Sequence, residues 1–415
     1  MSQTPLGKVS VREFFSGKCV LFTGVTGFVG KVLLEKYLDQ IPNIGKIYLL
    51  IRSKPKISLE ERLTKEIFSS RIFRPLFEKK PELLQVIRER VVPIKGDLVL
   101  EGLGIDPKVR AQLTDELDVI INSAASINFD DPIREALQIN FFGAKRILEL
   151  AHECKHLIAL HHVSTSYVNS YLPNNSVVPE EILPFPDPQW EQLIDSINKM
   201  DPQTSEREEP LILKRLGFPN TYTLTKNLAE QYIYKHRRPD LRVSISRPAV
   251  VTATDKFPFP GWTDSLAAAG AIFYSIGSAI SNKIHSYENV VCAQVPCDYV
   301  VNAMLVGTAI SAMAPKPDFM LYHVCPSHSQ PNITQFDLLK NSGEYIKFQP
   351  WDKTVGPYKK LTQMKTRREN IRWNHIDFTY YKMMALFNGL PYIGSKERQM
   401  YWGKRLFAGK SNMEK

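Results

Sequence analysis

Thr23-Gly24-Val25-Thr26-Gly27-Phe28-Val29-Gly30 is the stretch that decides the fold of this chain. It follows the apolar run Cys19–Phe22, which predicts a buried strand, and precedes Lys31–Leu38, which has helical periodicity. Strand, glycine-rich turn and helix in this order are the context that a dinucleotide fingerprint requires. Glycines let the backbone approach a pyrophosphate, and the helix N-terminus supplies N–H donors. The residues expected to bind a dinucleotide are Thr23, Gly24, Thr26, Gly27, Phe28, Val29 and Gly30. A strand–turn–helix with incidental glycines is the plain alternative to this Gly-x-x-Gly-x-x-Gly spacing.

The end of the next apolar run indicates which dinucleotide would bind. Ile47–Ile51 predicts a second buried strand, and Arg52 and Lys54 follow it. An acidic residue at this place would hold a ribose 2′-hydroxyl, whereas an arginine accommodates a 2′-phosphate. Arg52 and Lys54 therefore favour NADP(H) over NAD(H), although solvated charges at a strand end would give the same pattern.

Two further strands lead into residues suited to hold the same cofactor. Val91–Ile94 leads into Asp97 and Leu98, where the carboxylate of Asp97 is placed to accept a hydrogen bond from the adenine amino group. Val119–Ile121 leads into small residues that include Ala124, and small residues let a cofactor lie close to the backbone. A turn or capping role is as good an interpretation of each piece alone, so their order along one chain carries the prediction.

A fifth strand, Leu157–Val163, ends in hydroxyl residues, Ser164 and Thr165. Hydroxyls at a strand's C-terminal end face the crevice where open α/β sheets bind ligands, so one of them is a candidate to hydrogen-bond a substrate carbonyl. Asn140 lies within the predicted helix around Ile133–Cys154. We expect it to position a water molecule or a lysine of the site, with a solvent-facing helix asparagine as the alternative.

Tyr222 and Lys226 are four residues apart in a segment with helical character, so their side chains share one helix face. A nearby ammonium group stabilises a phenolate and lowers the tyrosine pKa from its usual value of about 10. Such a phenol can protonate an oxyanion near neutral pH. The Tyr-x-x-x-Lys pattern also occurs by chance on many helices, and the glycine motif is what favours a catalytic interpretation here. Together these motifs predict an α/β, Rossmann-like doubly wound parallel sheet.

The motifs resemble those of extended short-chain dehydrogenase/reductases and, more narrowly, those of fatty acyl-CoA reductases. The resemblance covers residues 14 to about 330 and fades beyond them. The stretches that carry the narrower resemblance include Asn122–Asp130, His162–Asn169, Pro219–Glu230, Ser246–Ala253, Phe257–Trp262 and Val295–Ala303.

The resemblance implies NADPH-dependent reduction of a long-chain fatty acyl-CoA to the alcohol through an aldehyde, with release of coenzyme A. Tyr222 would supply a proton, and Lys226 would lower the pKa of Tyr222 and hold the nicotinamide ribose. Thr165 is favoured over Ser164 and Ser166 as the hydroxyl that polarises the carbonyl. Alternatives are an enzyme that stops at the aldehyde, a reductase of carrier-bound acyl groups, a sugar-nucleotide epimerase or dehydratase, and a dinucleotide-sensing protein without catalysis.

Composition and charge set the cellular context that we expect. The five cysteines show no metal-like cluster, so no metal site is expected, and we interpret them as free thiols in a reducing compartment. The N-terminus lacks a secretory apolar core, and the most apolar window, Ser265–Ile280, is shorter than a membrane span and is expected to be a helix over the active site. These features predict a protein that is cytoplasmic or peripheral to an intracellular membrane.

The chain is expected to form a reductase domain over residues 14–350, with the substrate-side elements mainly in 250–350. Residues 55–90 read as a charged helical insertion, and residues 170–218 as an irregular excursion before the catalytic helix. A basic, aromatic-rich helical domain is expected over 351–415. From Tyr358 to Lys415 there are 13 Lys/Arg and 4 Asp/Glu, so this stretch carries nearly all of the chain's net charge of +10. Such a tail suits the phosphates of coenzyme A or an anionic membrane surface, and the rest of the sequence gives no reason to expect nucleic acid.

Overall fold

The computed structural model of the chain describes residues 10–265, 269–277, 283–285, 291, 293–315, 319–326, 334–348 and 362–364. The chain divides into two compact units. The first unit consists of Met1–Thr263, Val295–Cys325 and Glu414–Lys415, and the second consists of Asp264–Gln294 and Pro326–Met413. The predicted domain boundary at residue 351 lies outside the described residues.

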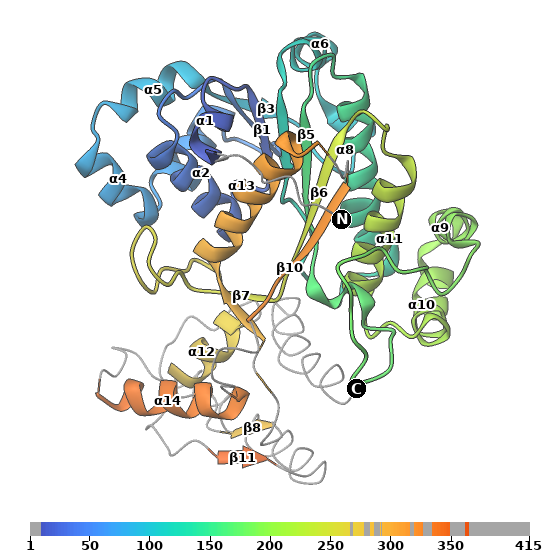
Figure 1. The fold of residues 1–415 in the computed structure, drawn as a ribbon. Helices are drawn as coiled ribbons and strands as arrows, with labels where there is room; N and C mark the ends of the chain where they lie inside the picture. Colours follow the sequence, from blue (N-terminus) through green and yellow to red (C-terminus); the bar gives the residue numbers. More distant parts are fainter. Residues whose placement is uncertain are drawn as a thin grey trace. The chain divides into compact units, whose positions relative to one another are not determined.

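A seven-stranded, wholly parallel sheet forms the centre of the first unit (Figure 1). Its strand order is β10-β6-β5-β4-β1-β2-β3. The strands are β1 (Val20–Thr23), β2 (Ile47–Ile51), β3 (Val91–Lys95), β4 (Val119–Asn122), β5 (Ala159–Val163), β6 (Arg242–Pro248) and β10 (Phe319–Val324). The order reverses between β1 and β4, which makes this the switch point of a doubly wound sheet. The predicted Rossmann-like fold is confirmed.

Helices cover both faces of this sheet (Figure 1). On one face, α6 (Pro107–Glu116), α8 (Phe142–Glu153) and α11 (Thr221–His236) share a continuous apolar cluster with the strands. On the other face, α13 (Cys297–Met313) packs against β5 and β6 and contacts α1 (Val11–Phe15) and α2 (Phe28–Gln40). The central strands β1, β2 and β4 are buried along their whole length, which explains their unbroken apolar runs.

The segment between β2 and β3 is helical, as its sequence predicts. It contains α3 (Leu59–Arg62), which continues directly into the π-helical turn η1 (Leu63–Phe68). The 3₁₀ turn η2 (Arg71–Phe73), α4 (Arg74–Lys79) and α5 (Leu83–Arg90) follow. The aromatic rings of Phe68, Phe73 and Phe77 contact one another and give the insertion a small apolar core of its own.

The prediction of an irregular excursion over residues 170–218 is wrong, because this segment contains two helices. They are α9 (Trp190–Lys199) and α10 (Pro202–Leu216). The polar and proline residues that suggested a loop start the second helix: Asp201 accepts hydrogen bonds from two backbone N–H groups, and Pro202 occupies the first turn.

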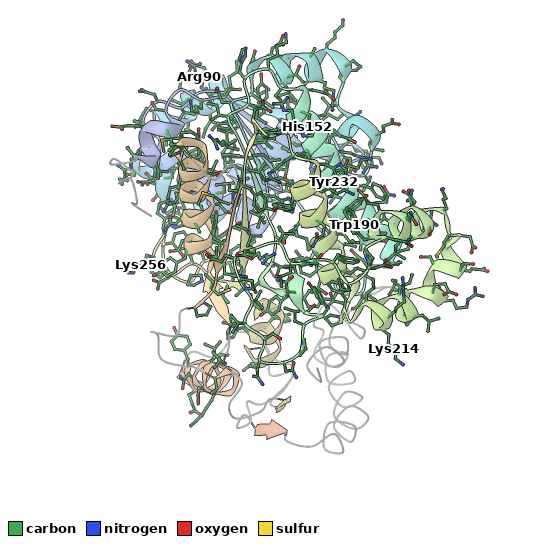
Figure 2. The ribbon with its side chains drawn as sticks, turned by 45° about the vertical axis from the view of Figure 1, so that its right-hand side comes forward. Arg90, His152, Trp190, Lys214, Tyr232 and Lys256 are labelled. Atoms are coloured by element: carbon green, nitrogen blue, oxygen red, sulfur yellow. The ribbon has the colours of Figure 1, made fainter. Side chains whose placement is uncertain are left out.

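Apolar residues of both helices pack with those of α11 in one cluster. Figure 2 shows Trp190, at the start of α9, close to α11, which carries Tyr232. The ring of Phe141 contacts both of these rings and so links the excursion to the covering helices.

The second unit is described in part. It contains α12 (Ala269–Gly277), which contacts α14 (Gln335–Phe348), and β8 (Lys283–His285), which pairs in parallel with β11 (Thr362–Met364). The predicted helix over Ser265–Ile280 corresponds to α12. Apart from β11, the expected C-terminal helical domain lies outside the described residues. None of the helices in the described ranges has the length and apolar character needed to cross a membrane.

Candidate active site

The residues expected to bind a cofactor and to catalyse follow the C-terminal ends of five neighbouring strands. Thr23 ends β1, Arg52 follows β2, Asp97 lies two residues beyond β3, Asn122 ends β4 and Ser164 follows β5. Because all these strands are parallel, their carboxyl ends meet at one edge of the sheet, on both sides of the switch point. The structure therefore gathers along one edge residues that are up to 141 positions apart in the sequence.

The glycine turn between β1 and α2 has no room for side chains at two positions. Gly24 has φ +75°, and a Cβ atom there would lie 2.9 Å from the backbone nitrogen of Ala124. A Cβ atom on Gly30 would lie 2.3 Å from the carbonyl oxygen of Gly24. The first turn of α2, which begins at Phe28, has no side-chain cap. A bare backbone concavity with helical N–H groups fits the pyrophosphate of a dinucleotide.

Thr23 organises the base of this turn. Its hydroxyl accepts hydrogen bonds from the backbone N–H groups of Ser123 (3.1 Å) and Ala124 (3.0 Å), and it donates to Oδ1 of Asn122 (2.7 Å). The side chain is buried, so it fastens the end of β1 to the end of β4. Sequence reasoning had placed Thr23 among the cofactor contacts and had assigned no role to Asn122.

The basic residues after β2 differ in their partners. Arg52 is exposed, and its backbone carbonyl accepts a hydrogen bond from the buried guanidinium of Arg62. The ammonium of Lys54 pairs with Glu66 at 2.8 Å, and Arg62 pairs with the same carboxylate at 2.5 Å. These two cations hold the pKa of Glu66 at about 2. Arg62 and Glu66, which sequence reasoning missed, lie four residues apart on the continuous helix formed by α3 and η1.

Asp97 and Leu98 lie beside the start of α8. Oδ1 of Asp97 accepts a hydrogen bond from the backbone N–H of Val99 at 3.2 Å. The side chain of Leu98 is buried, and its carbonyl accepts a hydrogen bond from Arg146 of α8 at 2.7 Å. The loop after β3 is therefore anchored to the covering helices.

Asn140 is hydrogen-bonded to other groups than Lys226, so the lysine alternative of its expected role is wrong, and the positioning of a water molecule stays a prediction. It lies in the π-helical turn η4 (Leu137–Phe141), between α7 (Ile133–Ala136) and α8. Its Nδ2 donates to the carbonyl of Ser126 and to the hydroxyl of Thr225, both at 3.1 Å, and its Oδ1 accepts from the backbone N–H of Ser126. Asn140 thus ties the loop after β4 to the neighbour of Lys226 on α11.

Tyr222, Lys226 and the hydroxyls after β5 come together at the edge of the sheet. The hydroxyl of Thr165 lies next to the phenol of Tyr222, where a hydrogen bond between them would lower the pKa of the phenol. Lys226 lies one turn further along α11, and its Nζ donates to the carbonyl of Val163 at 2.6 Å and lies 3.1 Å from Nε2 of His162. The buried hydroxyl of Ser164 has no protein partner. The geometry favours Thr165 over Ser164 as the partner of the phenol.

The pKa of Tyr222 is raised, whereas the Tyr-Lys spacing alone predicts that it is lowered. Burial raises the pKa of Tyr222 to about 12, and the hydrogen bond to Thr165 offsets only part of this increase. Lys226 does not lower it, because its amine points to β5 and burial lowers the pKa of Lys226 itself to about 8. The phenol therefore stays protonated over the whole neutral pH range, which keeps it available as a proton donor.

A loop of the chain packs against the glycine turn. The ring of Trp262 lies 5.3 Å from that of Phe28, at the start of α2. Asp298, in the first turn of α13, accepts hydrogen bonds from the backbone N–H groups of residues 255–257 at 2.9 to 3.2 Å and so fixes the start of this loop. Sequence reasoning missed Asp298, although an acidic residue at the start of a helical run is a recognisable capping signal.

Among the described residues, no group of three or more His, Cys, Asp or Glu side chains is arranged so that it could hold a metal ion. The cysteines Cys19, Cys154 and Cys325 carry free thiols, and Cys19, Cys154 and Cys297 are buried.

Comparisons with known proteins identify the family of this chain. The family described as Male sterility protein, a dinucleotide-binding family, matches residues 22–304. The chain is 35% identical to fatty acyl-CoA reductase 1 of Xenopus laevis over 76% of its own length and 59% of that protein. It is 34% identical to the enzyme of the same name from Mus musculus over 78% of its length and 60% of that protein. The chain thus spans about three fifths of the length of these curated relatives.

Solved structures share the fold. The terminal R domain from the myxalamid PKS-NRPS biosynthetic pathway is 25% identical, with a TM-score of 0.52 over 75% of this chain and 66% of that domain. The reductase domain of a nonribosomal peptide synthetase from Mycobacterium tuberculosis has a TM-score of 0.59 over 88% of this chain and 76% of that domain, at 17% identity. With the family match covering well over half of its residues, this chain belongs to the male sterility protein and fatty acyl-CoA reductase family.

Proposed function

We propose that this protein reduces long-chain fatty acyl-CoA to the fatty alcohol through the aldehyde, with NADPH as the reductant. The observation that carries the proposal is the placement of the Thr165 hydroxyl beside the phenol of Tyr222 at the carboxyl end of β5, with Lys226 one helical turn away. Two hydroxyls that meet at this edge can bind the same carbonyl oxygen. The glycine turn and the family relationship support a nicotinamide dinucleotide as the cofactor.

The residues that would hold the cofactor are distributed along the sheet edge. The backbone of the glycine turn suits the pyrophosphate, the guanidinium of Arg52 suits the 2′-phosphate, and the carboxylate of Asp97 suits the adenine amino group. Ala124 leaves space beside the turn, and Lys226 is assigned to the nicotinamide ribose. When bound, NADPH supplies the hydride that the reaction needs.

The protein's own groups would orient the thioester and handle its proton. Thr165 donates a hydrogen bond to the carbonyl oxygen and increases its polarisation. As negative charge develops on that oxygen, Tyr222 transfers its hydroxyl proton to it. The resulting hemithioacetal returns its hydroxyl proton to the Tyr222 phenolate as the C–S bond breaks, the departing coenzyme A thiolate takes a proton from solvent, and an aldehyde remains. The aldehyde is then reduced in the same orientation, and Tyr222 again protonates the oxygen to give the alcohol.

The proposed partners follow from this chemistry. The basic residues in the stretch 358–415 are assigned to the phosphates of coenzyme A or to an anionic membrane surface, which would keep the enzyme cytoplasmic or peripheral to a membrane. A carrier-bound acyl thioester is the second candidate substrate, because the myxalamid R domain shares the fold at 25% identity.

Product analysis tests the function directly. We expect incubation of the full chain with palmitoyl-CoA to consume two NADPH per hexadecanol formed and to release free coenzyme A. Accumulation of hexadecanal with one NADPH consumed would contradict the alcohol as product. Turnover of palmitoyl-pantetheine but not of palmitoyl-CoA would support carrier-bound substrates instead.

Tyr222→Phe is the matched variant for this assay. It removes one oxygen atom and keeps the ring that contacts Phe129. We expect turnover to fall by ~10²-fold or more, the scale of a lost general acid, with NADPH binding preserved. Near-normal turnover would exclude Tyr222 from the proton transfer.

A further inference from the structure

A buried chain of polar side chains runs from the glycine turn to the lysine of the active site. Its members are Thr23 at the end of β1, Asn122 at the end of β4, His162 in β5 and Lys226 on α11, and each is at most 2% exposed. Asn122 Nδ2 lies 3.1 Å from Nδ1 of His162, and Nε2 of His162 lies 3.1 Å from Nζ of Lys226. The proposed mechanism assigns no role to Asn122 or His162.

The direction of each hydrogen bond in this chain is fixed from its Thr23 end. Two backbone N–H groups, those of Ser123 and Ala124, already donate to the Thr23 hydroxyl. The hydroxyl proton therefore goes to Asn122, at 2.7 Å, and the atom that receives it must be the amide oxygen. The amide nitrogen of Asn122, which can only donate, consequently faces His162.

The next consequence concerns the tautomer of His162. Its Nδ1 accepts the hydrogen bond from Asn122, so it carries no proton. Burial holds the pKa of His162 well below its usual value, so the ring is neutral. A neutral imidazole without a proton on Nδ1 has its proton on Nε2, and this N–H points at Nζ of Lys226.

Lys226 must then accept a hydrogen bond, which only an uncharged amine can do, because an ammonium has three donors and no lone pair. The amine also donates to the carbonyl of Val163 at 2.6 Å. The arrangement seen here is therefore that of neutral Lys226. A charged Lys226 requires Nε2 of His162 as the acceptor, the proton on Nδ1 and the amide oxygen of Asn122 turned toward His162, which breaks the hydrogen bond that the Thr23 hydroxyl donates to that oxygen.

We propose that His162, held by Asn122, is a positioning residue that couples the charge of Lys226 to the hydrogen-bond direction of this buried chain. When Lys226 gains a proton, the directions of these hydrogen bonds reverse in the same step, because the tautomer of His162 and the orientation of the Asn122 amide change together. The meaning of this coupling for catalysis rests on the proposed function, whereas the coupling itself does not.

The other ionisable groups around this chain do not impose a charge on Lys226. The carboxylate of Glu230, one turn further along α11, favours the ammonium form but is already paired with Arg247 of β6 at 2.6 Å. His161 forms hydrogen bonds to the hydroxyls of Ser244 and Ser246. Burial is the largest effect and lowers the pKa of Lys226 to about 8.

Nuclear magnetic resonance of the full chain without added nucleotide tests the coupling. Imidazole nitrogens labelled with ¹⁵N report the tautomer of His162, and ¹³C-labelled lysine reports the charge of Lys226. We expect the His162 proton to reside on Nε2 at alkaline pH and to move to Nδ1 as Lys226 becomes charged, with the same midpoint. A tautomer that stays constant through the Lys226 titration would overturn the proposal.

The Asn122→Asp variant is expected to hold the hydrogen bonds of this row of side chains in the reverse direction at every pH. His161→Gln is its matched control. The carboxylate of Asn122→Asp can only accept, so it fixes the His162 proton on Nδ1 at every pH, and we expect the pKa of Lys226 to rise by about one unit or more. His161→Gln alters the preceding histidine of the same strand and should leave both signals unchanged. A His162 proton that remains on Nε2 in Asn122→Asp would contradict the assignment, and if this variant does not fold, the titration of the unmodified chain still decides.

The rate of palmitoyl-CoA reduction as a function of pH tests whether the charge of Lys226 matters for catalysis. We expect activity to decline as Lys226 loses its charge near pH 8 and this decline to move to higher pH in Asn122→Asp. An unshifted profile in a variant whose lysine titration has moved would remove the link to catalysis. Absence of turnover at every pH would refute the proposed function and leave the resonance result standing.

Discussion

Arg52 and Lys54 carry the same charge, yet their surroundings predict different roles. The ammonium of Lys54 is already paired with Glu66, whereas the guanidinium of Arg52 is exposed at the end of β2. We expect Arg52→Ala to raise the KM for NADPH by about tenfold or more, the scale of a lost charge-assisted hydrogen bond, and Lys54→Ala to raise it less. Steady-state kinetics with NADPH and NADH measure both effects. Equal losses in the two variants would contradict the assignment of the 2′-phosphate to Arg52.

Lys226 makes the stability of the protein depend on pH. Its pKa falls from an ordinary value of 10.5 to about 8 in the folded chain, so between these values the unfolded chain binds the proton and the folded chain does not. Stability then increases with pH, and the penalty of burying this charge, about 3 kcal/mol, is removed between pH 8 and 10.5.

Urea unfolding of the unmodified chain and of Lys226→Met from pH 7 to pH 10.5 checks this dependence. We expect the difference in unfolding free energy to move in favour of the unmodified chain as pH rises. Two parallel curves would show that Lys226 has an ordinary pKa in the folded protein.

At the residue scale, the spacing of Tyr222 and Lys226 correctly places both on one helix, α11, whereas their roles stay predictions. Asn140 was assigned the wrong partner because its real partners are Ser126, 14 residues away, and Thr225, 85 residues away. The four-residue chain through His162 was not foreseen for the same reason, since only the pairing of β1, β4 and β5 brings its members together.

The turn between β1 and α2 depends on the absence of a side chain at Gly30. A Cβ atom there would lie 2.3 Å from the backbone oxygen of Gly24. This oxygen cannot move away unless the backbone of the whole turn shifts with it. We expect Gly30→Ala to lower the unfolding free energy by about 3 kcal/mol, the upper range for overpacking, and to abolish measurable NADPH binding. Thermal unfolding and fluorescence titration with NADPH provide the two measurements.

Gly143→Ala is the matched control for this helix–turn contact. Its Cβ atom would meet the side chain of Leu98 at 3.0 Å, and a side chain can shift by a few tenths of an ångström. The better helix propensity of alanine offsets part of this cost, so we expect a change within about 1 kcal/mol. Similar losses in both variants would show that the Gly30 contact is not special.

At the scale of elements, the sequence predicted the five strands β1 to β5 from their apolar runs, but it did not predict β6 and β10. It failed for α9 and α10, where the proline and acidic residues that suggest a loop begin a helix. The apolar faces of these helices are recognisable only when α11, which they cover, is known to lie beside them. Polar composition is therefore a weak indicator of irregular structure when it coincides with helix caps.

At the scale of the whole molecule, the chain leaves the first unit and returns to it. Residues 264–294 belong to the second unit, but α13 and β10 rejoin the first, where β10 pairs with β6 along its whole length. The points of departure and return are close, because β7 (Val250–Thr252) pairs with β9 (Gln294–Pro296) and Thr254 is hydrogen-bonded to Trp262. No local pattern in the sequence reveals this return, since it depends on pairing between distant strands.

This connectivity predicts that the first unit is a self-sufficient dinucleotide-binding protein. We expect a chain in which a short Gly/Ser linker joins Thr263 to Val295, and which ends at Pro326, to fold cooperatively, because the seven strands, α13 and the glycine turn are all retained. Its dissociation constant for NADPH should stay within about threefold of that of the full chain, a difference of less than 1 kcal/mol. Calorimetric titration measures this affinity, and Gly30→Ala in the same shortened chain provides the non-binding control. Loss of NADPH affinity in a shortened chain that still unfolds cooperatively would mean that the second unit contributes to the cofactor site.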